Sequence, residues 1–530
     1  SFEFQIFFLT IFFEVFMQIF SFSPFGYEGA LVTVEVDLRR GIPAVDIVGL
    51  ADGAVKESRE RMQAAIRNSD FEFPTERVLI SLSPADLKKE GAGFDLPIAL
   101  GVLLSNAPKS VSEKFITDSV MVMGELELSG KIRGVKGVHA AISTAIANGI
   151  TRCIVPSGNL DEALEVEGAL VYGAETLRDA FDALGNVNVF KEKKVNSYNK
   201  DEVEFADLGK AFLFEDIKGQ YKLIRGLQIA AAGGHNFLAL GAPGCGKTMA
   251  IQKFPGINPL LTMDEAQSVT RIWSLAGLIK PNEPLIRVPP FRMPHQTATI
   301  EGICGGGVDV RPGEISLAHN GVLFLDEAGE FRSSVLQMLR VPLESKCITL
   351  SRAGRATCYP ANFQLLMAVN PCPCGNYGSK NKLCLCSSKS VEQYWKKFSA
   401  PLLDRIDLKV FVDNESEDVD SIGVRDGLQT TEEIRIGVKR AVSIQRKRQN
   451  KKNGDLFQNE IETFCKLDAE SNEILEKAVL RYGFSPRSIS SLKKVARTIA
   501  DIAGEQNING KAMAEAIEFK KDCVGVMPEV

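Results

Sequence analysis

The spacing of apolar residues divides the chain into regions with different secondary structure. Between Leu31 and Leu38, valines and leucines alternate with Thr, Glu and Asp, which predicts a strand with one buried face. A second strand is expected at Val78–Leu82, and a helix over residues 54–68, where Ala, Arg, Glu and Gln predominate. Together with further short strands and helices, this pattern predicts an α+β domain over residues 23–185.

The rest of the chain follows other patterns. Residues 186–205 are polar and rich in charge, and we expect them to form a linker. Residues 206–415 alternate short apolar runs with helical segments, which is typical of a parallel sheet covered by helices. Residues 430–525 have helical periodicity without a strand pattern, so they predict a C-terminal helical domain. The expected fold class is α/β, with an α+β domain before the core and a helical domain after it.

The first 22 residues do not fit these patterns. Residues 2–22 contain nine of the 31 phenylalanines, two glutamates and no Lys or Arg. A signal peptide needs a positively charged start and a small-residue cleavage site, and neither is present. Glu3 and Glu14 also weigh against a membrane-spanning helix. We expect residues 1–22 to be an apolar extension, with 1–16 lying upstream of the natural start. A membrane anchor is the alternative.

Composition narrows the classes of function. The 62 Lys and Arg against 67 Asp and Glu give a net charge of −5, which excludes a globally basic nucleic-acid coat protein but leaves room for a local basic patch. Eleven cysteines in 530 residues are too few for a disulfide scaffold. No run beyond the first 22 residues is long and apolar enough to cross a bilayer, so a cytoplasmic protein without a membrane partner is expected.

A phosphate-binding loop follows the apolar run Phe237–Leu240. The sequence matches G-x-x-x-x-G-K-[ST], in the expected position between a strand and a helix. Backbone N–H groups of such a loop surround phosphate oxygens, its lysine reaches the β- and γ-phosphates, and its hydroxyl ligates Mg²⁺. The predicted nucleotide-binding residues are Gly241, Ala242, Pro243, Gly244, Cys245, Gly246, Lys247 and Thr248.

Two later apolar runs also end in polar side chains. The strand predicted at Gly321–Leu325 is followed by Asp326, expected in the Mg²⁺ shell, and Glu327, expected to polarise the attacking water. The run that begins at Leu365 ends at Asn370, which we expect to orient that water beside the γ-phosphate. The alternative for Asn370 is an ordinary turn residue at the end of a strand.

Two arginines are candidates for contact with the γ-phosphate. Arg405 is expected to act as an arginine finger on the nucleotide of a neighbouring subunit; the alternative is a surface ion pair with Asp404 or Asp407. Arg487 lies at a predicted helix start in the C-terminal domain, from which it would reach the γ-phosphate. The alternative is an exposed arginine at the start of a helix.

The order of phosphate loop, Asp-Glu strand, Asn strand, Asp-Arg pair and helical lid resembles an AAA+ ATPase. Within that class the chain is similar to the magnesium-chelatase-like proteins of the YifB/ComM family, from residue 17 to about residue 520. The stretches that carry the resemblance are Ala230–Asn236, Phe291–His295, Pro312–Gly321, Asn370–Gly375, Ala496–Asp501, Val48–Arg59 and Gly91–Leu100. The resemblance implies a ring-forming, hexameric ATPase that uses ATP and Mg²⁺ and acts on DNA, as a helicase or branch-migration motor in natural transformation or recombination.

Three positions depart from the family pattern. Cys245 stands where Ser is usual in the phosphate loop, Gln296 where a second His is usual, and Ala328-Gly329 follows the two acids. A thiol at Cys245 would make the loop sensitive to oxidation but should not prevent nucleotide binding.

DNA contacts have weaker support in the sequence itself. Residues 347–359 predict a β-hairpin whose Arg352 and Arg355 flank an Ala-Gly turn. In the resembled fold such a hairpin points into a central pore, where guanidinium groups contact phosphates without reading sequence. A solvated hairpin tip is the alternative. Residues 439–452 hold seven Lys and Arg, which indicates either a duplex-contacting face or a plain solvated face. The insertion at 290–313 is glycine-rich, as a mobile pore loop would be.

Four cysteines form a compact group in the sequence, as two C-x-C pairs: Cys372, Cys374, Cys384 and Cys386. Four thiolates can enclose one tetrahedral Zn²⁺, although the usual spacing is C-x₂-C. We expect a structural zinc ion that fixes the segment between Asn370 and Arg405. Free thiols, or a disulfide in an oxidised sample, are the alternatives.

The N-terminal domain resembles the proteolytic domain of Lon protease. Lys89–Asp95 and Gly124–His139 look like its two catalytic stretches, but the nucleophile position falls on Gly93 and the lysine position on His139, with Lys136 nearby. Glycine offers no nucleophile, so acyl transfer of the Lon type is excluded and we expect a binding or assembly module rather than a protease.

Two alternatives to a DNA motor remain open. One is a metal-insertion ATPase like the true magnesium chelatase subunit, although that subunit lacks a Lon-like N-terminal domain. The other is an ATP-gated scaffold that remodels proteins without moving along DNA.

Overall fold

The computed structural model describes residues 18–89, 91–107, 119–193, 202–280, 284–307, 310–352, 355–377, 383–412 and 430–521. The chain forms two compact units, one made of Ser1–Val195 with Trp273–Leu285 and the other of Asn196–Ile272 with Ile286–Val530. Each unit has its own sheet. In the described part of the chain, every helix is too short or too polar to cross a bilayer.

A seven-stranded mixed sheet organises the first unit, in the order β3-β4-β2-β1-β5-β8-β9. Its strands are β1 (Ile19–Ser23), β2 (Ala30–Arg39), β3 (Val45–Val48), β4 (Arg77–Ser83), β5 (Val120–Val122), β8 (Arg152–Pro156) and β9 (Leu170–Ala174). A small hairpin, β6 (Glu125–Leu126) with β7 (Ile132–Arg133), lies outside this sheet. The alternation predicted from Leu31 to Leu38 is the register of β2, which pairs antiparallel with both β1 and β4.

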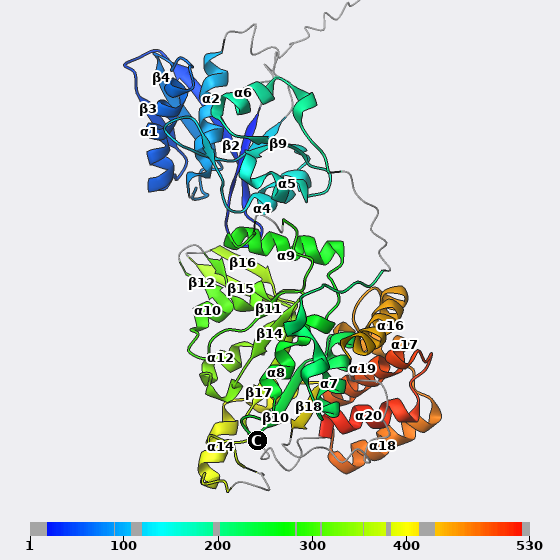
Figure 1. Cartoon of the computed structure of the whole chain (residues 1–530). Helices are drawn as coiled ribbons and strands as arrows, with labels where there is room; N and C mark the ends of the chain where they lie inside the picture. The colour runs from blue at the N-terminus through cyan, green and yellow to red at the C-terminus, as the bar shows by residue number, and fades with distance from the viewer. Residues whose placement is uncertain are drawn as a thin grey trace, which may run out of the picture. The chain divides into compact units, whose positions relative to one another are not determined.

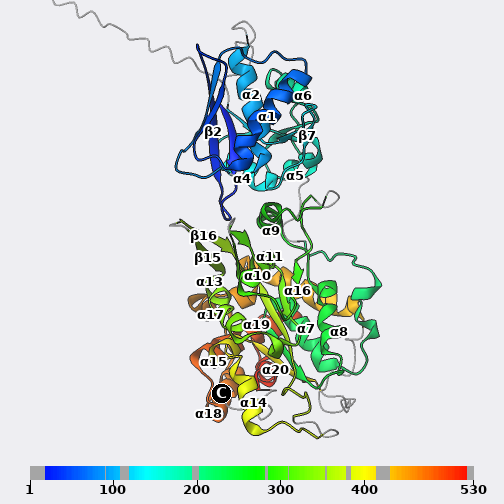
Figure 2. The same ribbon diagram turned by 90° about the vertical axis from the view of Figure 1, so that its left-hand side faces the viewer.

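Helices cover both faces of this sheet because neighbouring residues of a strand point to opposite sides. Val120 and Val122 of β5 pack in one hydrophobic core, while Met121 between them packs in the other. The first core takes side chains from α1 (Gly53–Asn68), α2 (Asp95–Asn106) and α6 (Leu177–Leu184), and Figure 2 shows these helices together on one side of β2. The second core takes side chains from α4 (Val138–Ala147) and α5 (Leu160–Leu164).

The start of this unit differs from the prediction. We expected residues 1–22 to lie outside the domain, but β1 begins at Ile19 and lies between β2 and β5. Ile19 and Phe22 are both buried, so the apolar residues just before position 23 belong to the core. Residues 1–17 lie outside the described part of the chain, so the expectation of an upstream extension or anchor stays a prediction.

The expected linker also differs in part. Lys191 forms a bridge to Val171 of β9, and Val203 is buried in the core of the second unit. Residues 194–201 lie outside the described part of the chain. Inside the predicted 206–415 core, Trp273–Leu285 is counted with the first unit, which no local pattern indicated.

A five-stranded sheet organises the second unit, in the order β11-β14-β17-β10-β18. All its strand pairs are parallel, as the alternation of apolar runs and helices predicted. The strands are β10 (Phe237–Gly241), β11 (Phe291–Arg292), β14 (Val322–Leu325), β17 (Gln364–Val369) and β18 (Leu408–Val412). The helices around it are α7 (Tyr221–Gly233), α8 (Lys247–Gln252), α9 (Met263–Ala276), α10 (Ile300–Cys304), α11 (Glu314–Leu317), α12 (Ser333–Met338), α13 (Pro342–Ser345), α14 (Ser388–Lys396) and α15 (Ala400–Leu403).

The C-terminal helices pack against one face of this sheet. They are α16 (Thr431–Gln449), α17 (Gln458–Phe464), α18 (Ala469–Tyr482), α19 (Pro486–Ala503) and α20 (Gly510–Lys521). Phe237 and Ala239 of β10 share a core with these helices, while Leu238 and Leu240 point into the core on the other face. Figure 1 shows α16–α20 gathered on the side of the sheet where α7 and β18 lie. The predicted helical domain is therefore a layer on the sheet rather than a detached unit.

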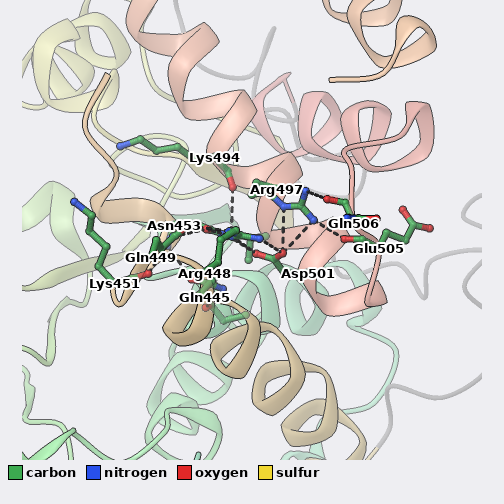
Figure 3. A network of polar contacts seen from close by, with 12 residues as sticks. Gln445, Arg448, Gln449, Lys451, Asn453, Lys494, Arg497, Asp501, Glu505 and Gln506 are labelled. Carbon is green, nitrogen blue, oxygen red and sulfur yellow. Dashed lines mark hydrogen bonds and ion pairs between the residues drawn. The ribbon is translucent and has the colours of Figure 1, made fainter. Parts of the chain in front are cut away.

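A buried charge network fixes this helical layer (Figure 3). Asp501 is fully buried in α19 and accepts two hydrogen bonds from Arg448 of α16, at 2.7 and 2.8 Å. Arg497 and Asn453 also donate to it, at 3.1 and 2.8 Å. Because a buried carboxylate is stable only when its charge is matched, these partners lock α16 to α19. Thr498 extends the network to His235, which precedes β10, through a 2.8 Å contact.

Candidate active site

The phosphate loop connects β10 to α8. Gly241 must be glycine because an added Cβ would collide with the carbonyl oxygen of Val412 in the neighbouring β18. Gly244 and Gly246 have φ values of +83° and +88°, which other residues rarely adopt. An added Cβ at either glycine would meet nothing within 4 Å, so this stretch of the loop borders open space. A loop of this kind presents N–H groups to an approaching phosphate.

Lys247 begins α8 and points back across its own loop. Its Nζ donates to the carbonyl oxygens of Gly241 and Ala242 at 2.7 and 2.8 Å, and lies 3.4 Å from Asn370 Oδ1. The side chain is 6 % exposed, and burial lowers the pKa of its ammonium group. A phosphate oxygen in place of those carbonyls would offset the free-energy cost of burying the ammonium charge, because it carries a full negative charge.

The two predicted Mg²⁺ ligands are neighbours. Thr248 Oγ1 donates to Asp326 Oδ1 at 2.8 Å, joining the start of α8 to the end of β14. A hydroxyl and a carboxylate are the oxygen ligands that Mg²⁺ prefers, and two protein ligands with the rest from water and phosphate are usual for this ion. The residues present therefore fit Mg²⁺.

Glu327 has an unusual backbone. Its φ and ψ of 47° and 48° lie in the left-handed region, which is rare for residues other than Gly, Asn and Asp. Its backbone N–H donates to Asp326 Oδ1 at 3.0 Å, and its side chain is exposed. Its carboxylate accepts a hydrogen bond from Gln296 in the predicted insertion. This contact was missed, although Gln296 had stood out as a departure from the family pattern.

Asn370 follows β17, which lies between β14 and β10 in the sheet. The carboxyl ends of these three parallel strands therefore meet at one edge, where Gly241, Asp326 and Asn370 lie. The sequence predicted these positions separately, and the structure brings them into contact with Lys247 and Thr248.

The two candidate arginines share a different partner. Arg405 donates to Pro401 O at 2.7 Å and forms an ion pair with Glu344, and Arg487 lies 3.7 Å from the same carboxylate. The hydrogen bond from Arg405 lowers the pKa of Glu344. In this chain both arginines therefore face α13 rather than the phosphate loop.

The alternative partners proposed for Arg405 are engaged elsewhere. Asp404 accepts hydrogen bonds from Ser485 and Ser488, while Asp407 accepts one from Ser491 and contacts His235. Glu344 carried no sequence signal, because it lies 61 residues before Arg405.

The four cysteines come together as the spacing predicted. Their sulfur atoms all lie within 4.8 Å of one another, and Cys372 is fully buried. A hydrogen bond from the backbone N–H of Asn376, with contacts from the other thiols, lowers the pKa of Cys374 to about 6. Burial and contacts with the neighbouring thiols raise the pKa of Cys384 and of Cys386, so of these three thiols Cys374 alone is favoured as a thiolate, the form that binds metal.

The predicted hairpin is present as β15 (Cys347–Arg352) and β16 (Arg355–Pro360), with Arg352 opposite Arg355. The side chains of both arginines lie outside the described part of the structure, so their contact with DNA stays a prediction.

The basic run 439–452 is only partly available as a surface. Arg448 binds Asp501, Arg446 donates to Glu202 O, Arg440 donates to Ile502 O, and Lys451 pairs with Glu460. Arg440, Arg448 and Lys451 thereby join parts of the helical layer, but Lys439, Arg440 and Lys447 are exposed, so a duplex-contacting face and a solvated face both stay predictions for this run.

The two Lon-like motif positions of the N-terminal unit, Gly93 and His139, both lie in the described part of the chain. Gly93 lies in a short 3₁₀ turn, where an added Cβ would meet Met123 and Val135. His139 is 1 % exposed on α4, and its backbone N–H donates to Glu162 at 3.0 Å. A glycine and a buried histidine at these two positions do not provide a nucleophile and its base.

Known proteins are similar to this chain along nearly its whole length. Three family models match: "Magnesium chelatase, subunit ChlI" over residues 213–419, "Subunit ChlI of Mg-chelatase" over 34–159, and "Magnesium chelatase, subunit ChlI C-terminal" over 428–520. Competence protein ComM of Haemophilus influenzae is 38% identical over 511 residues, 95% of this chain and 97% of that protein. YifB of Escherichia coli is 38% identical over 501 residues, 94% and 96% of the two chains.

A weaker similarity concerns part of the chain. The archaeal Lon protease of Methanocaldococcus jannaschii is 22% identical over 130 residues, 24% of this chain and 19% of that protein. This identity hints at the predicted Lon-like domain but does not extend to an activity.

Proposed function

The chain belongs to the ComM/YifB family of magnesium-chelatase-like proteins, and from this premise we propose that it is an AAA+ ATPase that assembles into a ring and uses ATP hydrolysis to move along DNA. The observation that carries the ATPase activity is the meeting of Lys247, Thr248, Asp326 and Asn370 at one edge of the parallel sheet. DNA as the substrate, in recombination or natural transformation, rests on the similarity to ComM.

Binding of ATP would begin with an exchange at Lys247. The ammonium group leaves the carbonyl oxygens of Gly241 and Ala242 and pairs with the β- and γ-phosphates, while loop N–H groups hold the same phosphates. Thr248 and Asp326 would hold Mg²⁺, which would supply positive charge to the phosphates.

Hydrolysis then depends on Glu327 and Asn370. Glu327 follows the Mg²⁺ ligand directly, and its exposed carboxylate accepts the proton of the attacking water once Gln296 releases it. Asn370 lies beside Lys247 and orients that water with its side-chain amide. Both residues act on the γ-phosphate side of the site.

The proposal of a ring depends on Arg405. Its guanidinium faces Glu344 and not the phosphate loop of its own chain, so we assign it to the nucleotide of a neighbouring copy. A finger supplied in trans requires a head-to-tail interface, and such an interface forms a ring when the rotation between successive copies closes. Arg487 shares Glu344 and would follow the γ-phosphate through movement of the helical layer. We propose a hexamer.

DNA would pass along the β15–β16 hairpin. Repeated around a ring, Arg352 and Arg355 would contact backbone phosphates, and such contacts weaken steeply as salt rises.

A second candidate function is that of a chelatase-like ATPase or protein-remodelling scaffold without DNA movement, which the descriptions of the family models favour. The similarity to ComM along both chains, N-terminal region included, favours the DNA motor.

The test is the rate of ATP hydrolysis by the purified protein with and without forked DNA at low salt. The motor predicts a rate that rises with DNA and falls back when salt is added. The variant Lys247→Ala controls for a contaminating ATPase. Hydrolysis that is indifferent to DNA, with no DNA binding at low salt, would favour the scaffold instead.

A further inference from the structure

We propose that Cys372, Cys374, Cys384 and Cys386 bind one zinc ion and that this metal site holds the three catalytic segments of the ATPase site in place. The first half stands on the geometry of the cysteines alone. The second half rests on the proposed function, and the experiments below separate the two.

The spacing of the sulfur atoms fits a tetrahedral metal. The Sγ of Cys372 lies 3.4 Å from that of Cys374 and 3.7 Å from that of Cys384, and the latter two are 3.6 Å apart. Four thiolates at a Zn–S distance of about 2.3 Å form a tetrahedron with sulfur–sulfur edges of about 3.8 Å. The observed spacing is close to this value and far longer than the roughly 2.05 Å of a disulfide.

The segment around the second pair is arranged by its thiols rather than by apolar burial. Leu383 and Leu385 are 82 % and 84 % exposed, while Cys384 and Cys386, which alternate with them along the chain, are partly buried against the hydrophobic core. The hydrophobic effect alone would turn leucines inward and leave the smaller thiols outside. Metal ligation supplies the force that selects the opposite arrangement.

The first pair has the supporting contacts of a metal site. The backbone N–H of Tyr377 donates to Cys372 Sγ at 3.3 Å, and the N–H of Gly375 donates to Cys372 O at 2.9 Å. N–H donation to a ligand sulfur stabilises its thiolate and fixes its direction.

The cysteine segment also touches the phosphate loop and the Asn370 strand. Gly375 lies so close to Pro243 that an added Cβ would collide with the proline ring. Trp395 donates from Nε1 to Pro371 O at 3.0 Å, directly after Asn370. The positions of Pro243 and Asn370 are therefore coupled to the fold of this segment.

The turn after the two acids is held by the helix that follows the last cysteine. α14 begins at Ser388, two residues after Cys386. The Tyr394 ring lies against Gly329, leaving no room there for a Cβ, and Lys397 Nζ donates to Gly329 O at 2.6 Å. One metal ion would thus fix the start of α14 and the turn that carries Glu327.

Metal content tests the first half. Protein purified under reducing conditions should contain one zinc per chain, measured by mass spectrometry of the elements, and cobalt exchanged into it should give the absorption of a tetrahedral thiolate site. Cys386→Ser should lose the metal, Cys386→His should keep it because imidazole is also a zinc ligand, and Cys358→Ser, an exposed thiol outside the cluster, should be unchanged. Wild-type protein that lacks zinc and takes up no cobalt would overturn the site.

Nucleotide binding and hydrolysis test the second half. Cys386→Ser should slow hydrolysis about ten- to a hundredfold and weaken ATP binding, while Cys386→His should restore both. If the Ser variant is misfolded, removing zinc from the wild-type protein with a chelator and adding it back should produce the same loss and recovery. Zinc loss without any change in ATP binding or hydrolysis would overturn the coupling.

A variant that keeps the metal isolates the contact with the Asn370 strand. Trp395→Phe should retain one zinc and still slow hydrolysis, because it loses the hydrogen bond to Pro371 O, directly after Asn370. Unchanged hydrolysis would contradict transmission through this contact. A wild-type protein that holds zinc but hydrolyses no ATP would leave the metal site standing and remove the proposed function. A wild-type protein that hydrolyses ATP but holds no zinc would support the proposed function and remove the metal site.

Discussion

The two sheets of this protein share a general architecture but not a chemistry. Both carry helices on two faces, and both units contain a lysine that is almost or fully buried beside carbonyl oxygens. In the second unit, Lys247 spans a loop that borders open space and lies beside Asn370 and the Mg²⁺ ligands. In the first unit, Lys89 is fully buried and donates to Pro84 O. Burial alone therefore does not make a lysine a phosphate ligand. Lys247 differs from Lys89 because its loop borders open space that a phosphate can enter.

Strand direction alone does not explain this difference. In the second sheet, β14, β17 and β10 are adjacent and parallel, so Asp326, Asn370 and the phosphate loop that follow them meet at one edge. In the first sheet only β2 runs against the other strands, so the carboxyl ends of the remaining six also share one edge. What distinguishes the second sheet is the glycine-rich loop after β10 and the acid and amide side chains after β14 and β17.

The largest expected effect comes from removing each buried lysine in turn. Lys247→Ala should abolish detectable ATP binding and hydrolysis, because the ammonium group is the main positive charge on the β- and γ-phosphates. Lys89→Ala should leave ATP binding unchanged and lower the free energy of unfolding by about 1–3 kcal/mol. Titration with a fluorescent ATP analogue and thermal unfolding separate the two outcomes. Tight ATP binding by Lys247→Ala would contradict the site.

Glu327 of the second unit and Glu162 of the first extend the comparison of the two units to the rate of ATP hydrolysis. Glu327→Gln should slow hydrolysis by about 10²–10³-fold while ATP still binds, because the amide cannot accept a proton from water. Glu162 of the first unit is 7 % exposed and accepts hydrogen bonds from His139 N and Asn159, so Glu162→Gln should change stability but not the rate. Single-turnover hydrolysis measures both, and a slow Glu162→Gln enzyme with normal stability would break the comparison.

The helical layer offers a third comparison. Asp501→Ala leaves Arg448 and Arg497 without their shared carboxylate, which should destabilise the second unit by about 3–5 kcal/mol. The first unit should keep its own transition in thermal unfolding monitored by hydrogen exchange. Asn472→Ala is the matched control and should change little, because Asn472 lies on the exposed face of α18. Equal loss of protection in both units would show that they do not unfold separately.

The smallest expected effect concerns Gln296. Its amide holds the Glu327 carboxylate, so Gln296→Ala should raise hydrolysis in the absence of DNA by about two- to fivefold, by freeing the base. Gln252→Ala serves as a surface control, because the exposed Gln252 side chain donates to Met293 Sδ at 3.8 Å and lies outside the phosphate loop. A large fall in rate for Gln296→Ala would instead make this residue part of the catalytic machinery.

Local signals predicted most of the second unit. Glycine spacing and apolar runs located the phosphate loop, Asp326, Asn370 and the β15–β16 hairpin, because each depends on a few consecutive residues. The cysteine cluster was also visible in sequence, and the structure brings its four sulfur atoms together.

Long-range contacts could not be predicted in the same way. Gln296 meets Glu327 across 31 residues, and Glu344 gathers Arg405 and Arg487 from different elements, with no pattern in the intervening sequence. β1 was assigned outside its domain because a strand buried on both faces looks like any apolar run. Such assignments depend on packing partners that the local sequence does not name.

The most direct test of the account mixes two inactive variants. Arg405→Ala keeps its own phosphate loop but lacks the finger, while Glu327→Gln keeps the finger but cannot hydrolyse ATP. If the finger acts between copies, equal amounts of the two should recover up to about a quarter of the wild-type rate, since that fraction of sites pairs an intact base with an intact finger. A mixture that forms rings and stays as inactive as its two components would contradict the claim that this ATPase works between neighbouring subunits.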